Sequence, residues 1–474
     1  MTLAVAAPRP HVRWSIAAAG TGLQLCLGTV YAWSYFQNPL MQAYGWTNAQ
    51  VAWVFSLAIC CLGLAAAWGG MNLARFGPRR LAMIGAGLFG AGYLVAAAAL
   101  HLKCLPLLYA GYGLIGGAGL GLAYVTPVAT VAKWFPDKKG LMTGMVVMGF
   151  GFGALLMSKL LASALVSALD ANYVTVFASI GAVMLAAALP LAAVMKNPPA
   201  GYAPPVLSPS RVACPRGCMR GHVPDQGQTH AQANSSPPQG GQALGMPPSV
   251  GKPSENPAAP PDADTLTARQ GLLSAQFALM WGVFFCNICA GIAIIGFQSP
   301  LMQDLYRKID SGMSAAELAA CGATLIAVSS IFNGLGRFAW GAISDRIGRV
   351  QTFRVMLASQ VVAFGLLLVV KEPCLFGAII CYILLCYGGG FGTMPSFVLD
   401  VFGPRLMATV YGVILTAWAA GGIVGPQIVA LCKDTYREDT ARAAAASFTV
   451  GGGLVVLGLV LSMFLSNRRL AARQ

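Results

Sequence analysis

The sequence predicts an all-α membrane protein with twelve transmembrane helices, arranged as two six-helix bundles related by pseudo-two-fold symmetry. Three observations lead to this fold class: an extreme composition, twelve apolar stretches of helical length, and an internal repeat. The chain has 474 residues, of which 57% are hydrophobic and only 9% are charged. A soluble protein carries about 25% charged residues. Such a hydrophobic chain cannot hide its apolar side chains in a soluble core, so lipid surrounds most of it.

Twelve apolar stretches have roughly the 20 residues that an α-helix needs to cross hydrocarbon. The apolar character of the first stretch continues far beyond the roughly 7–15 residues of a signal-peptide core, so we interpret it as an uncleaved span. We expect spans at 14–37, 48–72, 80–100, 105–132, 140–167, 172–195, 271–300, 315–343, 352–371, 374–399, 406–432 and 443–466.

Composition divides the chain into three parts. Residues 197–268 contain 15 of the 28 prolines, together with Ser, Gln and Gly and few aromatic residues. A segment of this kind cannot bury enough apolar surface to order itself. We therefore expect an N-terminal six-helix bundle at 1–196, a disordered Pro-rich cytoplasmic linker at 197–268, and a C-terminal six-helix bundle at 269–474.

The distribution of basic residues orients the spans. With both termini placed in the cytoplasm, 21 of the 30 Lys and Arg residues fall in cytoplasmic segments and seven fall in outer loops. This bias is the one that the positive-inside rule describes. The net charge of +15 is thus explained by topology rather than by nucleic-acid binding. We expect a multi-pass protein of the plasma membrane, or of the inner membrane in a bacterium, with both termini cytoplasmic.

An octapeptide is repeated near the end of the first predicted span of each half. YFQNPLMQ at 35–42 and GFQSPLMQ at 296–303 agree at six of eight positions, and loop motifs at 70–79 and 341–349 follow in the same order. Since each half has an even number of spans, both copies have the same orientation, related by an axis along the membrane normal. Two such bundles enclose a site near the midplane and expose it to alternate sides by rocking. A duplicated scaffold without transport is the alternative.

Several of these segments resemble a known family. GAISDRIGR at 341–349 is similar to the cytoplasmic loop motif of the major facilitator superfamily. Within that superfamily, the chain resembles the oxalate/formate antiporter family and, more distantly, the monocarboxylate transporters. The matching segments are GTVYAW at 28–33, WFPDKKG at 134–140, NPPAGY at 197–202 and NGLGRFAWG at 333–341. The resemblance covers nearly the whole chain except the linker, and it implies a secondary active transporter that works by alternating access.

The loop motif supplies candidates for a conformational latch between the two bundles. A carboxylate at such a helix end can pair with an arginine or cap a neighbouring helix. The candidates are Asp345, Arg346 and Arg349 in the C-terminal copy and Arg75 and Arg79 in the N-terminal copy. Ala74 stands where the N-terminal copy would have its acid, so that copy departs from the family pattern.

Arg337 is the leading candidate for substrate binding. A guanidinium inside a span is costly and usually faces a cavity or a partner, and its planar fork of donors matches a carboxylate. Its position resembles the substrate-binding arginine of the family; a snorkelling or structurally paired arginine is the alternative. Asn333 lies one helical turn earlier on the same face. In the animal monocarboxylate transporters, which the chain resembles distantly, the matching position is an acid that pairs with the arginine, whereas Asn333 is neutral. We therefore expect Arg337 to be available to an anion.

A second cation decides between monoanions and dianions. The oxalate-specific transporter has a lysine in span eleven, and the matching position here, counted from the Tyr-Gly at 411–412, is Trp418. The absence of a lysine at this position favours a monocarboxylate substrate such as formate, lactate, pyruvate or glycolate. Lys159 in span five is a candidate substitute, with snorkelling as the alternative. If Lys159 acts with Arg337, the function is instead that of an oxalate/formate-type dicarboxylate:monocarboxylate antiporter.

Aromatic residues are expected to line the chamber. Tyr31 shares one face of span one with Gln24 and Gly28, and the resemblance implies cavity-lining aromatics in spans four, five and ten. Each could instead pack in the core or face lipid. The complete aromatic set is Tyr31, Tyr124, Phe150, Tyr387 and Phe391. Trp418 is expected to narrow the substrate pocket. The Gly-rich run at 387–392 is interpreted as a helix-packing surface or as a flexible gate.

Other function classes lack their signals. The sequence has no Walker motif, no nucleophile–base pair and no zinc-ligand spacing, so we expect no enzyme activity, no cofactor and no metal. No Asp or Glu lies deep in a predicted span, so a carboxylate proton relay is not evident; uniport, antiport and proton symport stay open. The expected partners are a small organic anion and the lipid bilayer, with the chain working as a monomer. A non-transporting membrane sensor on the same scaffold is the alternative from another class.

Overall fold

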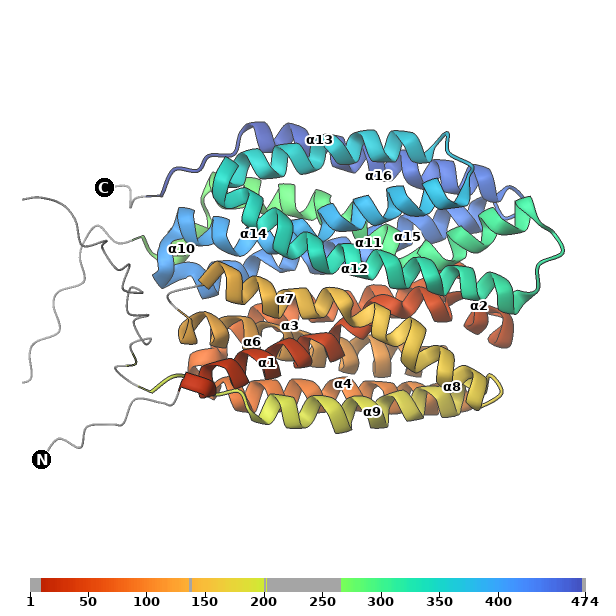
Figure 1. Cartoon of the computed structure of the whole chain (residues 1–474), viewed down its shortest axis with the longest axis horizontal. Helices are drawn as coiled ribbons and strands as arrows, with labels where there is room; N and C mark the ends of the chain where they lie inside the picture. Colours follow the sequence, from red (N-terminus) through yellow and green to blue (C-terminus); the bar gives the residue numbers. More distant parts are fainter. Residues whose placement is uncertain (1–9, 136–138, 200–201, 203–265, 471–474) are drawn as a thin grey trace, which may run out of the picture. The chain divides into compact units, whose positions relative to one another are not determined.

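The computed structural model describes residues 10–135, 139–199, 202 and 266–470. Within these residues, 12 helical segments are long and apolar enough to cross a membrane. The helices of the first half lie beside those of the second half, as the red-to-yellow and green-to-blue ribbons of Figure 1 show. The predicted fold class, an all-α membrane protein of twelve spans, is confirmed.

The first six spans occupy residues 11–193. They are built from α1 (Pro10–Leu27), η1 (Gly28–Ala32) and α2 (Trp33–Tyr44), then α3 (Asn48–Phe76), α4 (Pro78–His101), α5 (Leu105–Leu108), η2 (Tyr109–Gly116), α6 (Gly117–Trp134), α7 (Lys139–Leu155), η3 (Leu156–Leu161), α8 (Ala162–Ala168) and α9 (Tyr173–Ala193).

The second six spans occupy residues 275–463. A short α10 (Ala268–Leu272) precedes α11 (Ala275–Ile309), α12 (Ala315–Ile347), α13 (Arg349–Leu367), α14 (Pro373–Ile414), α15 (Thr416–Thr435) and α16 (Thr440–Met463).

Span one is longer than the sequence indicated. We predicted 14–37, but the helical segment runs from His11 to Tyr44. The repeated octapeptide lies near the end of the first span of each half, and its proline lies inside a helix in both copies: Pro39 in α2 and Pro300 in α11. A proline removes one backbone hydrogen bond, and membrane helices tolerate it where neighbouring helices compensate.

Span ten and the first part of span eleven together form α14, which bends sharply at one residue. Gly403 has φ +77° inside α14, in the left-handed region that suits glycine. This turn separates span ten, Pro373–Gly403, from span eleven, Arg405–Thr435. Span eleven continues through Leu415, where α14 ends and α15 begins. This second break, at Leu415, lies three residues before the predicted site residue Trp418.

Helices from the two halves pack directly on each other. α7 lies against α12 and α3 lies against α15, and these four helices carry most of the contact between the halves. Both halves belong to one compact unit, Met1–Pro204 with Leu266–Gln474. The predicted linker at 197–268 falls largely on residues outside the described ranges, so its bounds and its disorder stay predictions.

Candidate functional site

Arg337 lies inside the protein, where the two halves meet. Its side chain is on α12 and is 1% exposed. Nη1 donates to the backbone oxygen of Val147 on α7 at 3.3 Å, and Nε donates to Oδ1 of Asn333 at 3.4 Å. Nη2 is buried and has no hydrogen-bond partner among the described residues. The guanidinium therefore neither snorkels to a membrane surface nor faces lipid.

Arg337 has no counter-ion among the residues that the structure describes. Within the described part of the chain, the ionisable groups that act on it are four tyrosines, and no carboxylate is among them. The rings of Phe150 and Phe391 lie 5.4 Å and 4.8 Å from its Cζ atom. A cation over an aromatic face gains about 2 kcal/mol when water is excluded. Aromatic faces thus hold the charge in place without neutralising it.

Trp418 lies at the centre of the aromatic cluster. Its ring centroid is 4.7 Å from that of Phe391, 5.2 Å from Tyr124, 5.7 Å from Phe150 and 6.3 Å from Tyr31. These rings come from η1, α6 and α7 of the first half and from α14 and α15 of the second. The cluster therefore spans the plane along which the halves separate.

Tyr387 completes this cluster from the second half. Its ring lies 5.3 Å from Phe391 and 5.9 Å from Tyr31, and the Tyr31 and Tyr387 hydroxyl groups are hydrogen-bonded to each other. The structure thus brings together eight of the nine predicted substrate-binding residues. They are Arg337, Asn333, Tyr31, Tyr124, Phe150, Tyr387, Phe391 and Trp418.

Several hydrogen-bond donors of the cluster are unpartnered. The Tyr124 hydroxyl, the Tyr411 hydroxyl and Nε1 of Trp418 are buried and have no partner among the described residues, as is true of Arg337 Nη2. A buried polar group without a partner costs about 1–3 kcal/mol. Arg337 Nη2 and Trp418 Nε1 can only donate and the tyrosine hydroxyls can donate, so an acceptor-rich anion is a ligand that would satisfy them together.

Two polar residues of this region were absent from the predicted set. Tyr411 is 3% exposed and lies close to both Arg337 and Tyr124. Its hydroxyl approaches that of Tyr124 without reaching hydrogen-bond geometry. Gln24 is fully buried, and its Nε2 donates to the Tyr124 backbone oxygen at 3.0 Å. The seven-residue spacing of Tyr411 and Trp418, which is two helical turns, is the sequence signal that would have found Tyr411.

Glycines of α14 allow this helix to pack closely against α12 beside Asn333 and Arg337. A Cβ at Gly388 would lie 2.1 Å from the Asn333 backbone oxygen, and one at Gly392 would lie 2.0 Å from the Arg337 backbone oxygen. Such small-residue surfaces allow close helix approach in lipid. The Gly-rich run thus forms a contact with α12, which favours the packing interpretation over a flexible gate.

Lys159 is not part of the cluster. Its side chain is exposed on η3, and Nζ donates to Oγ1 of Thr324 on α12 at 2.7 Å. The structure therefore leaves Arg337 as the cation of the buried cluster and places Lys159 at the edge of the interface between the halves.

Comparison with known proteins identifies the family. The sequence profile described as the Major Facilitator Superfamily matches residues 18–426. The chain belongs to the major facilitator superfamily. It is 26% identical to the oxalate:formate antiporter of Oxalobacter formigenes, over 88% of this chain and 85% of that protein. It is 27% identical to the apicoplast pyruvate carrier 1 of Toxoplasma gondii, over 78% of this chain and 68% of that one.

A solved structure supports the fold independently. The nucleoside transporter NupG superposes with a TM-score of 0.61 over 95% of this chain and 99% of that chain, at 11% sequence identity. At this identity the likeness shows the fold alone. The family match and the twelve apolar helices together show a multi-pass membrane protein.

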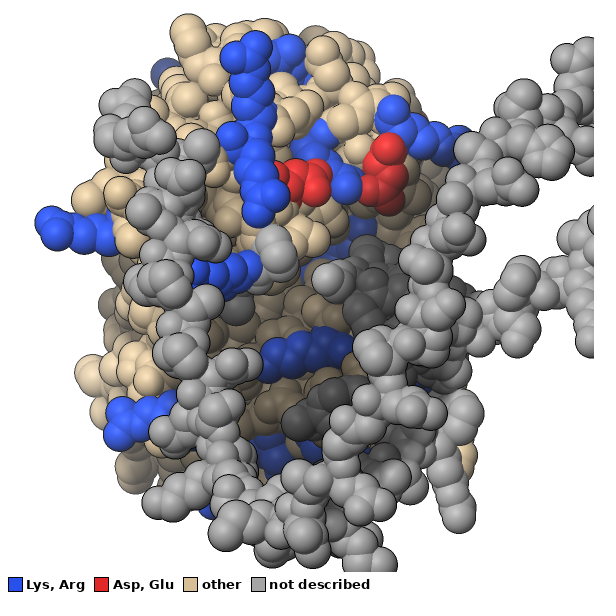
Figure 2. Space-filling model, turned by 90° about the vertical axis from the view of Figure 1, so that its left-hand side faces the viewer, with Lys and Arg blue, Asp and Glu red and all other residues tan. Residues whose placement is uncertain are grey.

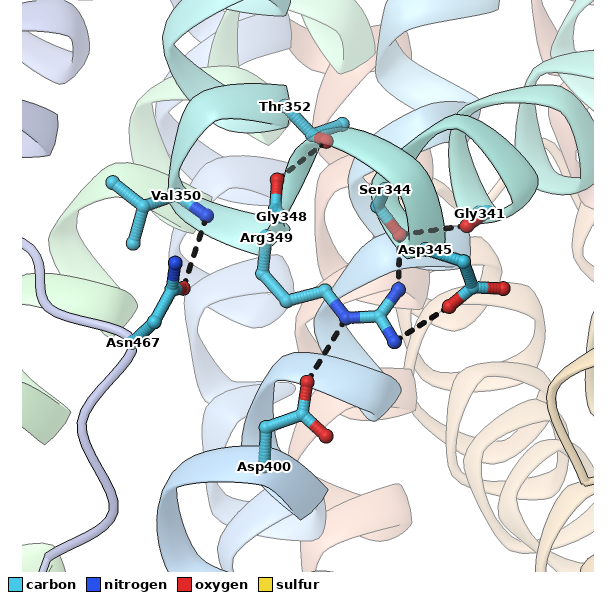
Figure 3. A network of polar contacts seen from close by, with 9 residues as sticks. All are labelled: Gly341, Ser344, Asp345, Gly348, Arg349, Val350, Thr352, Asp400 and Asn467. Atoms are coloured by element: carbon cyan, nitrogen blue, oxygen red, sulfur yellow. Dashed lines mark hydrogen bonds and ion pairs between the residues drawn. The ribbon is translucent and has the colours of Figure 1, made fainter.

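The loop motif of the superfamily forms a polar network within the second half (Figure 3). Arg349 Nη2 lies 2.6 Å from Asp345 Oδ1, Arg349 Nε lies 3.0 Å from Asp400 Oδ2, and Nη1 donates to Ser344 Oγ. These contacts join α12, α13 and α14 of one half. In this conformation the network does not cross to the other half, so a role as a latch between bundles stays a prediction.

The other predicted latch residues lie on exposed surface. Arg75, Arg79 and Arg346 are exposed, and Arg75 lies over the ring of Phe76 at 5.5 Å. Figure 2 shows this end of the molecule, where Lys and Arg side chains are spread over both halves and the acidic side chains gather in the upper one. The face recedes between the two halves.

Proposed function

We propose that this major facilitator protein carries small organic monocarboxylates of the formate, lactate and pyruvate type by alternating access. Arg337 is the cation that binds the carboxylate. One observation carries the proposal: among the described residues, the buried guanidinium has no partner for Nη2 and no carboxylate acting on it, and it lies among donors that can bind an acceptor.

The donor set fits a carboxylate better than a neutral ligand. A carboxylate offers two oxygens with about four acceptor sites and no donor. One oxygen can accept a hydrogen bond from Arg337 Nη2, while the Tyr124 and Tyr411 hydroxyls and Trp418 Nε1 donate to the remaining lone pairs. Charge-assisted bonds of this kind are roughly twice as strong as neutral ones.

The charge count favours a monoanion. Arg337 provides one positive charge, and Trp418 occupies the position where the resemblance implies a second. Lys159, the candidate replacement, is exposed and bonded to Thr324. A second carboxylate in this chamber would be buried among aromatic rings without a counter-ion, at a cost of several kcal/mol. This argues against the dicarboxylate:monocarboxylate antiporter.

The names of the relatives support transport of small carboxylates, without deciding between monoanions and dianions. One is named as an oxalate:formate antiporter and another as a pyruvate carrier. Both names describe transport of small carboxylates. In line with the loop charges, we further propose that both termini face the cytoplasm and that one chain forms the complete pathway.

The decisive experiment is uptake of labelled formate, lactate, pyruvate and oxalate into proteoliposomes, empty or preloaded. We expect uptake of at least one monocarboxylate and little of oxalate. The Arg337→Gln variant should lose it, whereas Arg442→Gln, an exposed arginine over Tyr436, should keep it. Stimulation by preloaded anion would identify exchange. Oxalate uptake equal to that of the monocarboxylates would contradict the monoanion proposal, and no uptake of any anion would favour the sensor.

A further inference from the structure

The beginning of α3 and the end of α15 meet across the interface between the two halves. Asp434, near the end of α15, accepts a hydrogen bond on Oδ2 from the backbone N–H of Ala49 at 3.0 Å. Its Oδ1 accepts a second from Asn48 Nδ2 at 3.3 Å. A carboxylate of one half therefore caps the first turn of a helix in the other half.

This contact completes a cap that α3 cannot complete alone. Thr47 and Gln50 form a capping box, in which Thr47 Oγ1 accepts from the Gln50 N–H at 3.2 Å and Gln50 Oε1 accepts from the Thr47 N–H at 2.9 Å. The N–H of Ala49 lies between these two and finds its acceptor in Asp434. Helix N-termini carry unpaired N–H groups and a partial positive charge, so a carboxylate is favourable there.

The lysine next to Asp434 does not compete with α3 for its carboxylate. The neighbouring Lys433 is paired with Asp304 on α11, which belongs to the same half. Lys433 and Asp304 are mostly buried. That ion pair neutralises the adjacent cation and leaves Asp434 directed across the interface.

Other polar contacts between the halves lie on the same side of the cluster. Asn38 Nδ2 donates to Gln303 Oε1 at 2.8 Å, and Gln427 Nε2 donates to Ser56 Oγ at 3.3 Å. At the opposite end, the Arg349 network stays within one half and the surface recedes between the halves (Figures 2 and 3). The structure is thus closed at the Asp434 end.

We propose that Asp434 is a gating residue that holds this end closed by capping α3 from the opposite half. Rocking of the halves must pull the carboxylate away from Ala49 and Asn48, so the cap exists in the closed state and is lost in the open one. A ligand or contact specific to one state shifts the balance between the two. Asp434 therefore sets how often this end opens, whatever the transported substrate is.

Hydrogen–deuterium exchange of the full-length protein in nanodiscs tests this inference. In Asp434→Asn we expect exchange to rise together in 35–44, 48–56, 298–306 and 428–436, which flank the closed end. Loss of a carboxylate at a helix N-terminus predicts a roughly two- to fivefold larger open population. Asp434→Glu should restore protection in part.

Asp439 provides the matched control. It caps α16 by accepting from the Arg442 N–H at 3.0 Å, within one half. Asp439→Asn should raise exchange in the first turn of α16 alone. If Asp434→Asn raises exchange only at 48–51, Asp434 is a local helix cap and the gating role is wrong. If that variant does not fold, Asn48→Ala decides by the same pattern, since it removes one of the two bonds and should give a smaller rise in all four segments.

Discussion

The hydroxyl oxygens of Tyr31 and Tyr387 lie 2.5 Å apart and form a hydrogen bond between the two halves of the protein. Tyr31 is in η1 and Tyr387 is in α14, and both side chains are buried. The bond lies beside the Arg337 cluster and joins η1 of the first half to α14 of the second. Rocking of the halves has to break it.

Removing either hydroxyl alone should destabilise the folded protein more than removing both. Tyr387→Phe leaves the buried Tyr31 hydroxyl without a partner, which costs about 1–3 kcal/mol of unfolding free energy. The double variant Tyr31→Phe/Tyr387→Phe leaves no orphaned hydroxyl and should recover part of the loss. Thermal or denaturant unfolding of the four proteins in one detergent measures this cycle. Strictly additive losses would mean that the two hydroxyls do not interact.

Arg337→Gln should separate stability from function. The native side chain is a buried charge without a counter-ion, and the penalty for such an ion is several kcal/mol. We therefore expect the ligand-free variant to unfold at an equal or higher temperature than the wild type. Its affinity for the anion should fall by roughly 10- to 150-fold, since bonds to a charged group contribute about 1.5–3 kcal/mol.

The measurement is a melting curve with and without added formate, lactate and pyruvate. Ligand-dependent stabilisation should be present in the wild type and lost in the variant. A variant that unfolds at a lower temperature without ligand would show that Arg337 is mainly a structural residue, held by Asn333 and Val147.

The number of spans was predictable from sequence because a helix in lipid must be apolar over a fixed length. The repeat and the Pro-rich segment predict the division into halves, and the loop charges predict the orientation of the spans. The exact ends were not predictable where local chemistry overrides hydropathy. The helix continues past Pro39, which usually ends helices in soluble proteins, because the packed neighbours of a membrane helix tolerate the lost hydrogen bond.

The candidate site was predictable for residues that are unusual in a span. Arg337 stood out by charge, and the aromatics stood out through the family resemblance. Tyr411 was missed although it lies seven residues before Trp418, because this spacing does not say which face of the helix is turned inward. Only the fold shows that its hydroxyl is buried without a hydrogen-bond partner among the described residues. Lys159 shows the opposite case: its charge was visible in the sequence, but its exposed position opposite Thr324 depends on which face of the helix is turned inward.

Trp418→Lys should move selectivity toward dianions. Trp418 lies in the cluster beside Phe391 and is fully buried. A lysine there would add a second cation near Arg337, and the extra charge would compensate a second carboxylate. Uptake competition should show oxalate inhibiting the variant more strongly than the wild type, with weaker inhibition by formate. Trp418→Met, which enlarges the pocket without charge, should not gain oxalate inhibition; an equal gain in both variants would assign the effect to pocket volume.

Gly392→Ala should disturb Arg337 although it adds one methyl group. The new Cβ would lie 2.0 Å from the Arg337 backbone oxygen, so α12 and α14 must move apart. Overpacking of this kind costs about 1–3 kcal/mol of stability. The displaced guanidinium should also bind the anion more weakly, which would appear as a higher KM for uptake.

Gly365→Ala is the matched control for this change. Gly365 lies on α13 with nothing within 4 Å of the position a Cβ would take. Since alanine is a better helix former than glycine by about 1 kcal/mol, that variant should be as stable as the wild type or more stable. Comparison of unfolding and KM for the two variants separates close packing from helix propensity. If Gly392→Ala behaves like Gly365→Ala, the contact between α12 and α14 does not position Arg337.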